Sequence, residues 1–259
     1  MNLFNIFLSD AQIFLLIAFR VTAIFLTAPI FGSANIPSRI KIGFAFIICF
    51  ILYPIIDKNF ILPTDALMFS FLILKQVFLG AIIGYATYLV FAGIQLSGQI
   101  VDLQMGFGIV NVLDPMSNLQ VSIMGQFEFL IGVLIFLSIN GHHLLIQAIA
   151  DSFKLTPIVN VGITNITLEK LTDLFFNMFL IALKIAGPAT VALFLTNIAL
   201  GFIARTIPQM NVFIVGLPIN ILIGIAAIMI SLPILVNMFN GLLNSMWTDI
   251  YVLIKSMKV

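Results

Sequence analysis

Charged residues are scarce in this chain. Of its 259 residues only 8% are charged and 62% are hydrophobic, and the 11 Lys and Arg nearly balance the 10 Asp and Glu. A soluble domain has roughly 25% charged and 45–50% apolar residues, so the soluble globular classes are excluded. Disorder is excluded too, because it requires low hydrophobicity. The sequence predicts an integral membrane protein, and its net charge of +1 gives no electrostatic reason to bind nucleic acid.

Catalytic and metal-binding signatures are also missing. The sequence contains no GxxxxGK[ST] loop, HExxH, CxxC or GxSxG motif. The single cysteine, Cys49, cannot form an internal disulfide. His142 and His143 are adjacent, so on a helix they point about 100° apart, which suits a shared metal poorly. We therefore expect no enzyme, no cofactor and no metal site. The histidines fit a helix end at the membrane surface, with proton sensing as the alternative.

Long charge-free windows occur along the whole chain, at 21–38, 42–56, 76–101, 129–150, 185–204 and 206–248. A helix needs about 20 apolar residues to cross the hydrocarbon core. With tolerable charges at their ends, the windows predict about six spans, six give or take one, near 11–28, 40–56, 66–93, 126–149, 175–201 and 212–236. A further apolar stretch, 238–254, is a short span or lies along the interface. The expected fold is an all-α integral membrane protein with one membrane-embedded domain over 1–259, and the Lys and Arg distribution favours a cytoplasmic C-terminus.

A few ionisable residues lie inside or beside these apolar runs. Such residues usually face a bundle interior, a wet cavity or a partner. They are scattered at helix ends, which favours structural pairing or snorkelling over a proton or ion relay. The residues are Arg20, Lys75, Asp102, Glu128, Lys184 and Arg205.

Residues 93–118 carry the most informative pattern. Gln95, Gln99 and Asp102 have helical i, i+4, i+7 spacing, with Gly98 and Gly106 on or near the same face. The other face is apolar and consists of Leu96, Ile100, Leu103 and Phe107. A helix with a polar, small-residue stripe is not exposed to lipid all round. We expect it to line a pathway or to pack tightly against another chain.

The end of this segment is rich in glycine. Gly106 and Gly108 flank Phe107, so the backbone bends freely there, and Asp114-Pro115 marks a turn. A short, bendable loop after a polar-faced helix predicts a gate or plug. The alternative is an ordinary re-entrant connection buried in protein.

Prolines interrupt or bound nearly every apolar run, which favours helices whose freed backbone groups are satisfied by neighbouring protein. These prolines are Pro29, Pro37, Pro54, Pro188, Pro208, Pro218 and Pro233. Gly80 and Gly84 form a small-xxx-small pair that permits close helix packing. Broken helices and small faces together favour a chain that packs within an assembly.

An ordered series of motifs resembles the FliR family along most of the chain. The series consists of Arg20 with Pro29-Ile30-Phe31-Gly32, Ile36-Pro37 with Arg39 and Lys41, Gly80 to Gly84, Gly98 with Asp102, Gln104, Gly106 and Phe107, Asp114-Pro115, Gly125-Gln126-Phe127, Asn140-Gly141-His142-His143, and Arg205 to Phe213 followed by Gly216 and Pro218. The Asn-Gly-His-His and Pro-Gln-Met-Asn-Val-Phe pieces resemble the flagellar branch rather than the related injectisome component.

This resemblance implies a structural and gating subunit of the flagellar type III export gate in the bacterial inner membrane, at the flagellar basal body. It implies a FliP-like part followed by a FliQ-like hairpin, assembled with FliP and FliQ homologues around a narrow channel. FlhA and FlhB homologues are the implied neighbours, and exported flagellar proteins the transit substrates. The competing reading is a stand-alone secondary transporter or channel that uses its intramembrane charges.

The resemblance also implies roles for individual residues. The plug would run from Met105 to Leu119, with Phe107 and Met116 as fillers and with Asp102 and Gln104 at its base. The named plug residues are Met105, Gly106, Phe107, Gly108, Asp114, Pro115 and Met116. The polar face above it consists of Gln95, Gln99, Asp102 and Gln104. A hairpin tip that contacts neighbouring components would consist of Arg205, Pro208, Gln209, Met210, Asn211 and Phe213. The alternative is intramolecular stapling, in which these residues only hold the two arms of the last hairpin together.

Overall fold

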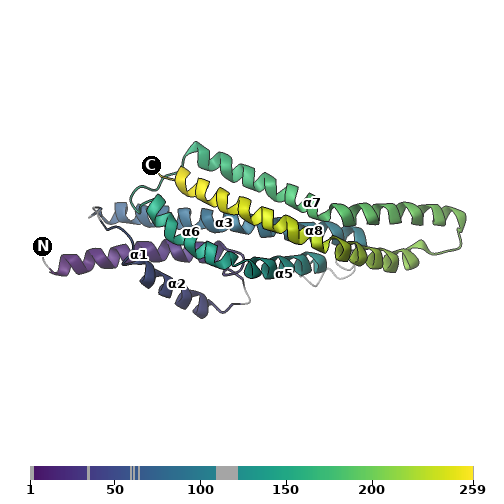
Figure 1. The fold of residues 1–259 in the computed structure, drawn as a ribbon, viewed down its shortest axis with the longest axis horizontal. Helices are drawn as coiled ribbons and strands as arrows, with labels where there is room; N and C mark the ends of the chain where they lie inside the picture. The colour runs from purple at the N-terminus through teal and green to yellow at the C-terminus, as the bar shows by residue number, and fades with distance from the viewer. Residues whose placement is uncertain are drawn as a thin grey trace. The chain divides into compact units, whose positions relative to one another are not determined.

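The computed structural model describes residues 3–33, 36–58, 60, 62–63, 65–108 and 122–258. Within these ranges the chain is helical, and its strand-like pairing is an isolated bridge between Val161 and Lys258. The helices, coloured from purple to yellow in Figure 1, are α1 (Leu3–Thr27), α2 (Ser38–Leu52), α3 (Ala66–Met105), α5 (Ile123–Ser138), α6 (Gly141–Leu155), α7 (Asn165–Thr206) and α8 (Val212–Ser256). The expected all-α membrane fold is confirmed.

The helices that could span a membrane are slightly fewer than the expected number of about six. In the described part of the chain, four helices are long and apolar enough to cross a membrane, or five if α5 and α6 form one bent span. The stretch expected at 40–56 is the short helix α2, of 15 residues, which begins directly after Pro37 and ends before Pro54. Pro54 has no backbone N–H to continue the helical hydrogen bonds, which accounts for the end of α2 just before it.

Two expected boundaries are also different. The span expected over 126–149 is divided at Asn140, whose φ of 59° is left-handed, and α5 and α6 meet there at 71°. The stretches 212–236 and 238–254 are a single helix, α8. Pro188 lies inside α7, and Pro218 and Pro233 lie inside α8, so these helices continue past their prolines.

The chain divides into two compact units. The first contains Met1–Leu89, Asn140–Leu174 and Asn244–Val259, and the second contains Val90–Ile139 and Phe175–Leu243. The boundaries fall within α3, α7 and α8, so three helices continue from one unit into the other.

Close contact between α1 and α3 organises the first unit. A Cβ atom added at Gly80 would lie 2.5 Å from the carbonyl oxygen of Arg20, and one added at Gly84 would lie 2.8 Å from that of Ile24. Real Cβ atoms do not approach so closely, so only glycine fits at either position. The close packing expected from the Gly80–Gly84 pair is therefore confirmed.

The second unit has a core of aromatic and small side chains. Phe91 packs edge-on against Phe129, Phe136 and Phe239. Beyond it, the last turns of α3 pack on α7 and α8 through a buried cluster of Val101, Met105, Ala186, Ala189, Leu193 and Ile228. This cluster holds the end of α3, where the candidate site lies.

Candidate functional site

The carboxylate of Asp102 ties the end of α3 to the start of α5. Asp102 is buried, and it accepts a hydrogen bond from the hydroxyl of Ser122. The backbone N–H of Met124 lies 3.2 Å from both carboxylate oxygens. Ser122 is also the N-cap of α5, since its hydroxyl accepts from the N–H of Gly125 at 2.8 Å. Asp102 therefore fixes the position at which the chain re-enters a helix after residue 121.

Gly98 and Ser97 extend this contact by one turn of α3. A Cβ atom on Gly98 would lie 2.5 Å from the carbonyl carbon of Met124, so the two backbones touch. The hydroxyl of Ser97 donates to the buried carboxylate of Glu128 on α5. Asp102, Gly98 and Ser97 thus form one face of α3 that packs against α5. The sequence identified Asp102 and Gly98 on a common face but not their partners.

The other predicted polar residues do not join this face as one stripe. Gln95 is half-buried and Gln99 is exposed. Gln104 lies on a different side of α3, where it lines a cavity between α3, α7 and α8, and its Oε1 atom has no hydrogen-bond partner among the described residues. Asp102 and Gln104, which the resemblance assigns to one base, therefore face different neighbours.

The described part of the predicted plug begins inside the core. Met105 is the last residue of α3 and is fully buried, with its side chain resting on Gly224 of α8. Gly106 has a φ of 90°, a conformation that favours glycine and ends the helix. The N–H of Phe107 donates to the carbonyl of Asp102 at 3.1 Å, and its side chain packs on the core cluster. Asp114, Pro115 and Met116 lie outside the described residues.

The predicted partner-contact motif forms the turn between α7 and α8. α7 ends at Thr206 and α8 begins at Val212. The side chain of Asn211 caps α8 by accepting from the N–H of Phe213 at 3.1 Å. Arg205, Pro208 and Gln209 are exposed, as is Phe213, whose side chain is 77% accessible.

The cavity that Gln104 lines also contains residues of the predicted partner-contact motif, so the predicted plug and this motif meet there. It has a volume of about 350 Å³ and is lined by Gln104 and Gly106 at the end of α3 and by Phe213 and Gly216 at the start of α8. Asn197 and Asn220 also line it, and Asn220 donates to Asn197 across the hairpin at 2.9 Å. Sequence reasoning missed this pair. Its signal is an asparagine at a similar distance from the turn in each apolar arm, nine residues before Thr206 and eight residues after Val212.

Arg20 is bound by an amide oxygen and backbone carbonyls, and it has no carboxylate partner among the described residues. It is fully buried in the first unit, and its guanidinium donates to Gln76 Oε1 at 2.7 Å and to the carbonyls of Ser152 and Thr156 at 2.9 and 3.1 Å. Its charged end also lies 4.1 Å from the centre of the Phe153 ring. Arg20 therefore joins α1, α3 and the end of α6, in agreement with the structural-pairing hypothesis.

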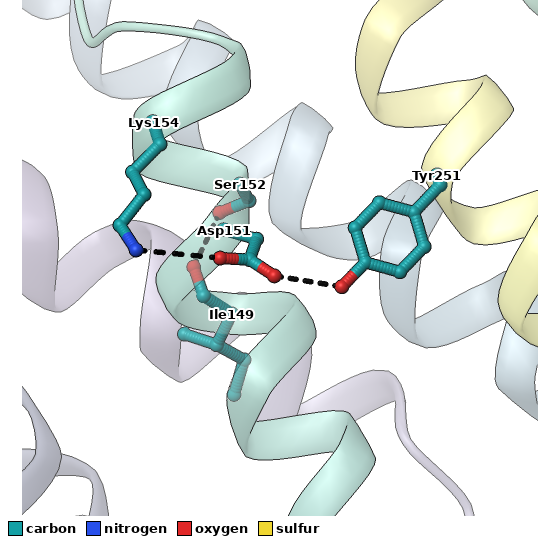
Figure 2. A network of polar contacts seen from close by, with 5 residues as sticks. All are labelled: Ile149, Asp151, Ser152, Lys154 and Tyr251. Atoms are coloured by element: carbon teal, nitrogen blue, oxygen red, sulfur yellow. Dashed lines mark hydrogen bonds and ion pairs between the residues drawn. The ribbon is translucent and has the colours of Figure 1, made fainter.

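A second polar network joins α6 to the C-terminal part of α8 (Figure 2). The hydroxyl of Tyr251 donates to Asp151 at 2.7 Å, and Lys154 lies 3.6 Å from the other oxygen of the same carboxylate. Burial and this hydrogen bond together raise the pKa of Tyr251 to about 12. Nearby, Lys170 of α7 pairs with Asp249 of α8 at 2.7 Å.

The two histidines lie at the bend between α5 and α6. Their ring centroids are 4.2 Å apart, and His142 Nδ1 has no hydrogen-bond partner among the described residues. Within the same ranges, no group of His, Cys, Asp and Glu side chains is arranged to hold a metal ion. The proton-sensing role stays a prediction.

The fold and the site define an all-α integral membrane protein whose buried polar side chains tie its helices together. Residues 11–246 match the family described as Bacterial export proteins, family 1, and the chain belongs to this family.

Similar proteins in other bacteria support this membership, and all three compared below are FliR proteins. The chain is 38% identical over 226 residues to the flagellar biosynthetic protein FliR of Bacillus subtilis strain 168, covering 86% of each chain. It is 31% identical over 220 residues to FliR of Escherichia coli K12, covering 83% of this chain and 82% of the relative. It is 32% identical over 221 residues to FliR of Aquifex aeolicus, covering 85% of each. The chain is a flagellar export component of the FliR family.

Proposed function

We propose that this chain is a structural and gating subunit of the flagellar type III protein export gate. In this proposal it forms, with FliP and FliQ homologues, the narrow channel through which unfolded flagellar proteins leave the cell. FlhA and FlhB homologues are its neighbours at the base of the flagellum in the inner membrane. The chain supplies no chemistry and acts as part of a conduit.

The length of the helices is the observation that carries this proposal. α3, α7 and α8 contain 40, 42 and 45 residues, which at about 1.5 Å per residue corresponds to about 60–68 Å of helix. The hydrocarbon core of a bilayer is about 30 Å thick, and helices tilt by about 40° at most. The part of α7 within the second unit, 175–206, is by itself about 48 Å of helix, so some of it extends beyond the hydrocarbon even at that tilt.

Apolar side chains are exposed along the full length of these helices. On α7, Phe176 near the start, Leu183 and Phe194 in the middle, and Phe202 near the end are each 60–69% accessible in the isolated chain. Whichever stretch the lipid covers, exposed apolar side chains remain outside it. Exposed apolar surface of this extent marks a protein interface. A stand-alone transporter would leave that surface in water, whereas an assembly with other apolar chains covers it.

The contacts of Asp102 support the gating part of the proposal. Residues 109–121 connect α3 to α5, and Asp102 holds the two flanking helix ends together. A plug needs fixed ends so that its displacement opens the channel without unfolding the subunit. Gly106, at a positive φ directly after α3, provides the bend at one of these ends.

The test is the composition of the native complex. The chain is tagged at its C-terminus in its native host, solubilised gently and weighed intact by native mass spectrometry. The proposal expects a large hetero-oligomer that contains FliP-like and FliQ-like chains. A monomer or homo-oligomer, recovered from membranes in which those partners are present, would favour the transporter reading.

The α7–α8 turn is the proposed contact with neighbouring export components. The side chain of Arg205 is exposed and forms no hydrogen bond or ion pair with other described residues, so its charge does not hold the two arms of the hairpin together. We expect Arg205→Ala to reduce secretion while the complex still assembles. Failure of the variant complex to assemble would favour a stapling role instead.

A further inference from the structure

Two buried carboxyl groups lie at the contact between α3 and α5, and their surroundings differ. Asp102 of α3 is 6% exposed and Glu128 of α5 is 2% exposed. The hydroxyl of Ser122 donates to Asp102, and the N–H of Met124 lies 3.2 Å from both of its oxygens. Glu128 has one hydrogen-bond partner among the described residues, the hydroxyl of Ser97. Acidic residues whose environments differ in this way often differ in protonation state.

Among the described residues, no cation offsets a negative charge on Glu128. Four side chains in the described part of the second unit can carry a charge, namely Asp102, Glu128, Lys184 and Arg205. The two cations are exposed on α7 and form no ion pair or hydrogen bond with Glu128, and the part of α8 in this unit carries no ionisable group. Asp102 is therefore the charged group that acts on Glu128, and its negative charge opposes a second one.

Ser97 can serve Glu128 in either protonation state. Its hydroxyl oxygen contacts Oε2 of Glu128 and lies 2.6 Å from the carbonyl oxygen of Ile94, and it has a single hydrogen to donate. When Glu128 is ionised, that hydrogen points at the carboxylate. When Glu128 is protonated, the acid donates to the hydroxyl oxygen and Ser97 turns its hydrogen to Ile94. The protonated state therefore makes two hydrogen bonds where the ionised state makes one.

We propose that Glu128 binds a proton in the folded chain and that this proton strengthens the contact between α3 and α5. A buried carboxylate without a paired cation is costly, whereas the neutral acid avoids both this cost and the repulsion from Asp102. In an unfolded chain the same carboxyl group meets water and is ionised at about pH 6. Folding then takes up a proton, so the stability of the chain falls as the pH rises.

The protonation of Glu128 can be read directly, because the chain contains two glutamates, Glu128 and Glu169. The full-length chain is synthesised cell-free with glutamate that carries ¹³C at the side-chain carboxyl, and its infrared spectrum is recorded in detergent micelles at about pH 6. Glu169→Gln leaves Glu128 as the labelled group, and we expect the carbonyl stretch of a protonated acid. Glu128→Gln leaves the exposed Glu169 and supplies the carboxylate reference. Carboxylate bands alone in Glu169→Gln would overturn the proposal.

The effect of the proton on stability is measured by melting the full-length chain in one detergent at about pH 6 and about pH 9. Glu128→Gln is the test variant, because its amide donates to Ser97 as the protonated acid does but cannot ionise. The melting temperature of the wild type should fall by about 3 °C or more beyond the fall of this variant. Glu169→Gln is the matched control and should follow the wild type. Equal falls in wild type and Glu128→Gln would show that the proton does not strengthen the contact.

Discussion

Gly98 of α3 and Gly125 of α5 bring the backbones of their helices into direct contact. A Cβ atom on Gly125 would lie 2.8 Å from the carbonyl oxygen of Gln95, and one on Gly98 would meet the backbone of Met124 and Gly125. Backbone atoms cannot move aside as the end of a flexible side chain can. This contact sets the distance between the two helices that flank the proposed plug.

We therefore expect Gly98→Ala to destabilise the chain by about 1–3 kcal/mol, the usual cost of overpacking a core. The free energy of unfolding can be measured by SDS titration in mixed micelles. Gly187→Ala is the matched control, because a Cβ atom there meets nothing within 4 Å. In a helix interior that control should be neutral or stabilising by up to about 1 kcal/mol. Equal behaviour of the two variants would contradict the close contact.

The contacts of Asp102 lead to a second prediction. Asp102→Asn replaces one acceptor oxygen with a donor, which opposes the N–H of Met124, so we expect a loss of about 1–3 kcal/mol. Ser122→Ala removes both the cap and the hydroxyl bound to Asp102 and should cost about 1 kcal/mol. Because the residues share one network, the double variant should lose less than the sum of the two. Strict additivity in this cycle would mean that they do not interact.

Arg20 provides a test of buried pairing. Arg20→Met leaves Gln76 Oε1 and the carbonyl of Thr156 without their donor, whereas the carbonyl of Ser152 still accepts from the N–H of Thr156. Each acceptor left unsatisfied costs about 1–3 kcal/mol. We expect a loss of about 3 kcal/mol or more, with partial recovery in Arg20→Lys, because lysine lacks the planar fork of donors. Fluorescence-detected size exclusion after graded heating measures this. Lys184→Met, at an exposed position, should change stability by about 0.5 kcal/mol or less.

Tyr251 should titrate at unusually high pH. Its pKa in the folded chain is about 12, above the ordinary value of 10.0, because burial and the hydrogen bond to Asp151 favour the neutral phenol. The resulting stability is therefore fully present below pH 10 and is lost as the pH rises through about 12. The difference in phenolate absorbance between wild type and Tyr251→Phe isolates this group. A midpoint near 10 in that difference would contradict the contact with Asp151.

Shortening the segment from Gly106 to Asn111 tests the gating proposal. If residues after α3 plug the channel, the assembled gate should leak small solutes, which membrane conductance detects. The shortened chain expressed without FliP and FliQ homologues is the control, since no channel should form and no conductance should appear. Unchanged conductance of the assembled complex would count against a plug at this position.

Local spacing in the sequence predicted the features that depend on a single helix. Gly98 and Asp102 were placed on one face because residues four apart share a face. Their partners, Gly125 and Ser122, follow from tertiary packing, which spacing along one helix does not contain. The acceptors of Arg20 are mainly backbone carbonyls, and since every residue has one, they carry no sequence signature.

Helix ends were harder to predict than helix positions. Charges marked where a span begins, but α3 continues to Met105 because Gln95 and Gln99 are tolerated in a helix that packs against protein and not only lipid. Likewise, nothing between 236 and 238 breaks a helix, so α8 continues without interruption. Among the expected spans, the one at 40–56 differs most from the structure, because two prolines confine α2 to 15 residues.

The continuity of α3, α7 and α8 through both units limits how this polypeptide can be divided. A cut at any unit boundary on these helices would create a new helix end with four backbone N–H or C=O groups lacking partners. In an apolar environment, each such group left without a hydrogen bond costs several kcal/mol of free energy. We therefore expect either unit, cut out at these boundaries, to be less stable than it is within the whole chain.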